Sequence, residues 1–179
     1  YQLLEESLVF AKQDREYFSQ YIDRCFLFDQ DARLIATATK YLGDKEVSLG
    51  IQADLQLAAA QAHFLRGNFT VAAQFIKDYH LDQTADGFLL NCQILWESGD
   101  RAGALAELDA ALVSYPAGLR LLATKAFWLK EQGELSRAKD CLDLMDVSAP
   151  GKPEPLIQSL NVLPGEANRT ARAAIIEKA

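Results

Sequence analysis

The chain has 179 residues, of which 50% are hydrophobic and 24% are charged, and its formal net charge is −7. This composition predicts a folded chain that can build its own apolar core. The acidic balance argues against nucleic-acid binding, which needs a clustered positive surface. No apolar stretch is long enough to cross a bilayer, so we expect no direct membrane insertion.

The composition fits a cytoplasmic protein and a periplasmic protein equally well. Because the sequence begins at Tyr1 rather than at an initiator methionine, we expect an excerpt of a longer protein or a mature product. A catalytic domain or further repeats could therefore flank the segment.

The N-terminal residues 1–52 predict helices without a regular repeat. A first helix is expected over 1–10, and Asp14 is expected to open a second that resembles the second helix of a repeat; its apolar residues are Phe18, Tyr21, Ile22 and Cys25. Residues 29–31 offer polar caps for a further helix, and Gly43-Asp44 is expected to end that helix and begin the next. We expect residues 31–51 to form an irregular helical pair.

A repeated pattern is marked by three glycines, Gly67, Gly99 and Gly133, which are spaced 32 and 34 residues apart. Glycine can close a helix in a left-handed conformation at little steric cost. The pattern predicts helical hairpins at 53–84, 85–118 and 119–152. The first helices carry a small residue at the same place: Ala60, Cys92 and Ala126. The second helices carry apolar residues at three equivalent places: Ala72, Ile76 and Tyr79 in the first hairpin, Ala104, Leu108 and Ala111 in the second, and Ala138, Leu142 and Met145 in the third.

After three prolines between 150 and 155, apolar residues at helical spacing predict a final helical pair over 153–179. This pair could cap the array or receive further repeats. It is also a candidate for self-association through the terminal helices. The whole chain is then one helical-repeat domain, 1–179.

The hairpins resemble the tetratricopeptide repeat (TPR) family. The shared features are the small first-helix residue, the turn glycine and the alanine five residues later, and the last two hairpins also have a proline after the second helix, which the hairpin at 53–84 lacks. The first-helix aromatic of the family is Phe88 in one hairpin but Gln56 and Leu122 in the others. The resemblance implies an all-α fold, a right-handed α-solenoid of stacked antiparallel helix pairs. The alternative is an unrelated array of helical hairpins.

Residues that could carry catalysis are few. Cys25, Cys92 and Cys141 match no metal spacing and are expected to be buried thiols. His63 takes the place that leucine holds in the later hairpins, so it is expected to pack in the core. There is no phosphate-binding glycine loop or nucleophile elbow. We therefore expect no enzyme, no cofactor and no metal site.

The resemblance implies that the first helices line a concave groove that binds a protein or peptide. Reading the same offset in each hairpin gives three rows of side chains on that face: Leu57, Leu89 and Ala123; Gln61, Gln93 and Phe127; and Phe64, Trp96 and Lys130. The aromatics could hold an apolar peptide while the glutamine amides pair with its backbone. The alternative is that Phe64, Trp96 and Phe127 only pack between hairpins.

Two functions remain in competition. The first is a protein–protein interaction scaffold or adaptor that binds a partner protein or peptide in the groove. The second is a structural segment of a larger assembly, such as a bacterial envelope secretion or polysaccharide-export complex. An exposed apolar C-terminal helix would favour the second.

Overall fold

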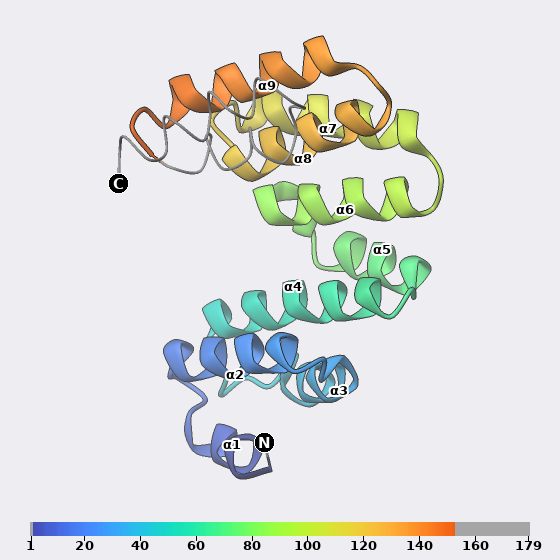
Figure 1. The fold of residues 1–179 in the computed structure, drawn as a ribbon. Helices are drawn as coiled ribbons and strands as arrows, with labels where there is room; N and C mark the ends of the chain where they lie inside the picture. The colour runs from blue at the N-terminus through green and yellow to red at the C-terminus, as the bar shows by residue number, and fades with distance from the viewer. Residues whose placement is uncertain (1, 153–179) are drawn as a thin grey trace. The chain divides into compact units, whose positions relative to one another are not determined.

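The computed structural model describes residues 2–152, with side chains from residue 5 onward, and all regular secondary structure in that part is helical (Figure 1). The expected all-α class is confirmed for the described residues, whereas the helical pair expected over 153–179 lies outside them. The elements are α1 (Gln2–Ser7), η1 (Leu8–Phe10), α2 (Arg15–Leu27), α3 (Asp31–Tyr41), α4 (Leu49–Leu65), α5 (Phe69–Asp78), η2 (Leu81–Gln83), α6 (Ala85–Glu97), α7 (Arg101–Ser114), α8 (Leu119–Glu131) and α9 (Leu135–Ser148).

The chain divides into two compact units, the first ending at Asp100 and the second beginning at Arg101. In the first unit α4 packs against α2, α3, α5 and α6 and lies between α2 and α6 (Figure 1). One apolar cluster joins α2, α3 and one side of α4, and a second joins the other side of α4 to α5, η2 and α6. The long α4 is therefore the shared wall of two adjoining cores.

In the second unit α8 packs against both α7 and α9. Its core is formed by buried side chains of α8 and α9, with Leu105 and Leu112 of α7 packed against them. The expected close-approach positions are confirmed, since Ala104, Ala126 and Ala138 are each fully buried. Small side chains at these places let helices approach closely.

The turns after α4, α6 and α8 share one geometry. Their glycines, Gly67, Gly99 and Gly133, have φ of 74°, 94° and 81°. In each turn the glycine N–H donates to the carbonyl three residues back, and the next N–H donates to the carbonyl five residues back, at N···O distances of 2.8–3.0 Å. This is the Schellman motif, which satisfies the last free carbonyls of a helix. The left-handed glycines expected from the sequence are thus confirmed.

A fourth turn of the same geometry comes after α2. Asp29 has φ of 52° and its N–H donates to the Phe26 carbonyl at 3.3 Å, while the Gln30 N–H donates to the Cys25 carbonyl at 2.7 Å. Helix α2 is therefore the first helix of a pair whose second helix is α3, and its interpretation as a second helix was wrong. The glycine pattern missed this pair because an aspartate takes the left-handed position, which aspartate tolerates better than most residues.

The register of this fourth pair agrees with the others. Counted from the left-handed residue, α3 places Leu34, Ala38 and Tyr41 where the later second helices carry their apolar residues, and all three are buried. The Tyr21 and Thr37 hydroxyls also share a buried hydrogen bond of 2.8 Å between α2 and α3. Tyr79, the corresponding residue of the next pair, is instead the C-cap that follows α5 and is 38% exposed, so its expected core position was wrong.

The segment after α3 also differs from the expectation. Gly43 comes after the end of the helix with φ of 85°, but Asp44 begins no helix, and α4 starts only at Leu49 with Ser48 as its N-cap. The Asp44 side chain accepts the Glu46 N–H at 2.9 Å. A side chain that bonds its own backbone two residues on favours a turn over a helix. Residues 31–51 therefore contain one helix, a loop and the start of α4, and not a helical pair.

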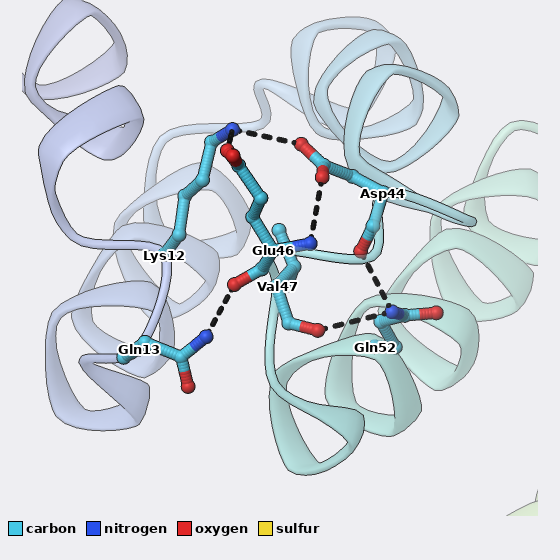
Figure 2. Close-up of polar contacts among 6 residues, drawn as sticks. All are labelled: Lys12, Gln13, Asp44, Glu46, Val47 and Gln52. Carbon is cyan, nitrogen blue, oxygen red and sulfur yellow. Dashed lines mark hydrogen bonds and ion pairs between the residues drawn. The ribbon is translucent and has the colours of Figure 1, made fainter.

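Figure 2 shows how this loop is held. Lys12, from the segment between η1 and α2, forms ion pairs with Asp44 and Glu46, and the Gln13 amide donates to the Glu46 carbonyl. From α4, the Gln52 amide donates to the carbonyls of Asp44 and Val47, at 3.0 and 3.1 Å respectively. These side chains join two loops to the first turns of α4.

Gly87 marks a close approach of η2 to α6. A Cβ atom built at Gly87 would lie 1.9 Å from the Leu81 carbonyl oxygen, which is backbone and cannot move aside cheaply. By contrast, a Cβ at Gly50 of α4 would meet the Arg15 side chain at an ordinary 3.5 Å. The two helical glycines are therefore predicted to respond in opposite ways to substitution by alanine.

We predict that Gly87→Ala lowers the free energy of unfolding by about 3 kcal/mol through overpacking. Gly50→Ala is the matched control and should leave it unchanged or raise it by about 0.5–1 kcal/mol, because alanine is the better helix former. Chemical denaturation followed by far-ultraviolet circular dichroism measures both. Equal stability of the two variants would contradict the close approach.

Candidate binding surface on the first helices

Helix α4 presents one open stripe. Asp54, Leu57, Gln61 and Phe64 recur every three or four residues, which places them on one helix face, and all four are partly exposed. The positions beside this stripe are buried, since Ala58 on one side packs with α2 and α3 and Ala60 on the other packs with α5 and α6. Three of the side chains predicted for the groove, Leu57, Gln61 and Phe64, therefore lie together on the accessible face of α4.

The apolar members of this stripe also take part in packing. Leu57 and Phe64 lie against the cluster that joins α4, α5 and α6, and the Phe64 ring is 5.6 Å from the Phe69 ring. Their exposed edges remain available while their other edges support the fold. Gln61 is only partly buried and lies between them along the helix.

The three side chains of α6 that were predicted to line the groove differ in their exposure. Leu89 is 4% exposed and Trp96 is 7% exposed, whereas Gln93 is partly exposed. The expectation that Leu89 and Trp96 project freely from the surface is therefore corrected, because their side chains are buried. Of the three, Gln93 is the side chain that a partner could reach without rearrangement of the helix.

In the second unit α8 carries Ala123, Phe127 and Lys130. Phe127 is 43% exposed, and the Lys130 ammonium lies 5.9 Å from the centre of its ring. Ala123 is partly buried against the core of this unit. An exposed aromatic beside a cation offers both apolar area and a charge to a partner.

The fourth turn adds α2 to this surface. The positions that match Leu57, Gln61 and Phe64, counted from the left-handed residue, are Ser19, Asp23 and Phe26 of α2. Asp23 is exposed, and Ser19 and Phe26 are partly exposed. Sequence reasoning left them out because it recognised repeats by their glycines. The signal that could have found them is the row of apolar residues at 34, 38 and 41.

A shallow hollow lies between α2 and α4 on this side. It is lined by Arg15, Glu16 and Ser19 of α2 and by Asp54 of α4. Arg15 bridges the two helices through paired bonds of 2.7 and 2.8 Å to the Asp54 carboxylate. The carboxylate hydrogen bond and charge raise the pKa of Arg15 above its usual value. Fork-shaped pairing of this kind fixes the relative position of two side chains.

His63 lies on the other side of α4. Its ring is 5.4 Å from the Phe75 ring, and its Nδ1 atom is buried with no hydrogen-bond partner among the described residues. Burial, and to a smaller degree the charge of Arg66, lower the pKa of His63 below its ordinary value. The side chain thus packs between helices, and its orphaned Nδ1 lacks the orienting hydrogen bond that a general-base histidine usually has.

Within residues 2–152, no three His, Cys, Asp or Glu side chains gather closely enough to hold a metal ion. None of the helices in that part of the chain has the length and apolarity to span a membrane. Cys25, Cys92 and Cys141 are buried and free, as expected. Burial raises the pKa of Cys25 and of Cys141, which disfavours their reactive thiolate forms.

We predict that Trp96→Ala lowers the free energy of unfolding by about 3–5 kcal/mol, as truncation of a buried tryptophan does. Phe127→Ala, at a half-exposed ring, should cost about 1 kcal/mol or less. Denaturation followed by circular dichroism compares the two. A stability loss for Phe127→Ala as large as that for Trp96→Ala would show that Phe127 is also a core residue.

We also predict that the stability of the chain falls as the pH drops from about 6.5, the usual histidine value. The pKa of His63 is lower in the folded chain than in the unfolded chain, so the unfolded chain binds the proton more readily. Acid therefore lowers the free energy of unfolding until the pH falls below the pKa of His63 in the folded chain. His63→Leu should reduce this loss between about pH 7.5 and about pH 5.5, the range that spans the usual histidine pKa. His80→Asn, at the exposed left-handed residue after α5, is the control and should retain it.

Comparison with known proteins gives no relative for this chain: no protein-family model, no curated protein and no solved structure matches it. The repeated turn and the open faces of the first helices are therefore the observations from which a function can be drawn.

Proposed function

We propose that this chain is a TPR-like helical-repeat scaffold that binds a peptide or a segment of a partner protein on the faces of its first helices. In this proposal the helix pairs stack as a right-handed α-solenoid, and the first helices line its concave side. The observation that carries the proposal is the open stripe of α4, which is flanked by α2 and α6 in the same unit. The recurrent Schellman turn supports it by giving each first helix the same register.

The chemistry of the stripe suits a peptide. Leu57 and Phe64 offer apolar edges that are already ordered by packing, so little side-chain entropy is lost on binding. Gln61 lies between them, and its amide can donate to and accept from a peptide backbone. In α8, Phe127 and Lys130 would provide a second contact region. The buried Leu89 and Trp96 would support the surface rather than contact the partner.

A second candidate function is assembly into a larger complex, such as an envelope secretion or export scaffold. The observation that favours it lies on α9, where Leu144 is 55% and Val147 is 78% exposed, one turn apart on the same helix face. Exposed apolar side chains at helical spacing can mark an association surface. A concentration-dependent mass that is lost in Leu144→Ser/Val147→Ser would support this candidate.

To test the first function, the immobilised chain would be used to select binders from a library of random peptides. We predict that Gln61→Ala weakens binding of the selected peptides by about 1 kcal/mol, or roughly fivefold in Kd. Gln74→Ala is the matched control, because Gln74 is an exposed glutamine on the second helix α5 and donates to Asp78 one turn along the same helix.

Equal effects of the two glutamine variants would contradict a site on the first helices. The proposal would also be contradicted if the selection enriches no peptide beyond the enrichment seen with an unrelated helical protein. Thermal unfolding of both variants should match that of the parent chain, since neither side chain is fully buried. This separates a loss of contact from a loss of fold.

A further inference from the structure

Charge is distributed unevenly over the first helices of the first unit. Counted back from the left-handed residue, each places a carboxylate at the same position: Glu16 in α2, Asp54 in α4 and Asp86 in α6. Glu16 is exposed and the other two are partly exposed. Because α4 contacts both α2 and α6, the three carboxylates occupy equivalent positions on neighbouring helices, and we refer to them as the carboxylate row.

The helices that carry this row contain few cations. Neither α4 nor α6 contains a lysine or arginine. In α2, Arg24 lies in the last turn, and Arg15 lies beside the row, where it is engaged with Asp54. Asp23, exposed on the same face of α2, adds a further negative charge. The hollow between α2 and α4 opens at this row, since Glu16 and Asp54 line it.

The apolar part of the surface runs parallel to the carboxylates. Leu57 and Phe64 lie about one and three turns further along α4 than Asp54, and Phe26 matches Phe64 on α2. The surface therefore has a carboxylate row followed, further along α2 and α4, by an apolar band of Phe26, Leu57 and Phe64, beside which Asp23 adds a charge on α2. A partner that satisfies both must carry positive charge on one side and apolar side chains on the other.

We propose that the face formed by α2, α4 and α6 takes a cationic amphipathic segment of a partner protein. Lysine or arginine side chains of the segment meet the carboxylates of Glu16 and Asp86, and its apolar side chains meet Leu57 and Phe64. Complementary charge selects the partner and accelerates encounter, while apolar contact holds it. This inference rests on the proposed function and specifies the chemistry of the partner.

The test uses three fluorescein-labelled peptides and the full chain. One peptide combines leucine and lysine so that it is amphipathic as a helix; the second has glutamate in place of lysine, and the third has serine in place of leucine. Fluorescence anisotropy should detect binding of the leucine–lysine peptide alone. Its Kd should rise about tenfold in Glu16→Gln/Asp86→Asn, consistent with the loss of two charge contacts.

The control is Asp140→Asn/Asp143→Asn, which removes the same charge from exposed positions on α9. It should change the Kd by roughly twofold or less, as remote surface charges do under physiological screening. Equal weakening by both double variants would show general attraction to an acidic chain and overturn the inference. Circular dichroism verifies that both variants are folded.

The failures of the two proposals are distinguishable. If the leucine–glutamate peptide binds instead and depends on Gln61, the cationic partner is wrong while the binding surface stands. If the leucine–lysine peptide binds but is indifferent to both Gln61→Ala and Glu16→Gln/Asp86→Asn, both proposals fail. If the serine-containing peptide binds as tightly as the leucine–lysine peptide, the apolar band makes no contribution to binding, and the inference of an amphipathic partner is wrong.

Discussion

The arrangement of the helix pairs depends on one backbone constraint, the left-handed residue after each first helix. At Asp29, Gly67, Gly99 and Gly133 this residue lets two N–H groups reach back to the carbonyls of the final helical turn. Each helix end is thereby satisfied without a side chain. Within a unit the same turn sets the phase between α2 and α3, between α4 and α5 and between α8 and α9, so equivalent positions can be counted from it.

This constraint explains which parts of the fold could be predicted from the sequence. Glycine at a left-handed turn is a strong local signal because other residues incur a steric cost there. The three glycine turns and the buried small residues beside them were accordingly predicted, whereas the turn at Asp29 was not. Because that turn was not recognised, the repeat position of α2 could not be counted from it, and α2 was interpreted as a second helix instead of a first helix.

The loop before α4 illustrates a second limit. A glycine followed by an aspartate indicates the end of one helix, but it does not say whether the aspartate caps a new helix or bonds within a loop. In the folded chain Asp44 accepts the Glu46 N–H and pairs with Lys12, which comes from a distant segment. Contacts of this kind depend on tertiary structure, so α4 could not be placed at Leu49 from periodicity alone.

The candidate surface was predictable in its register and less so in its exposure. Equivalent offsets identified Phe64 and Trp96 as members of one row, yet Phe64 is partly exposed and Trp96 is 7% exposed. Burial of a side chain on a helix face depends on how closely its neighbours approach, which repeat spacing does not determine. The chemistry at an equivalent position also changes freely along the chain: the carboxylate row is confined to the first unit, and Arg120 stands at its place in α8. A repeated backbone thus allows the first unit to favour a cationic partner without imposing that preference on the second.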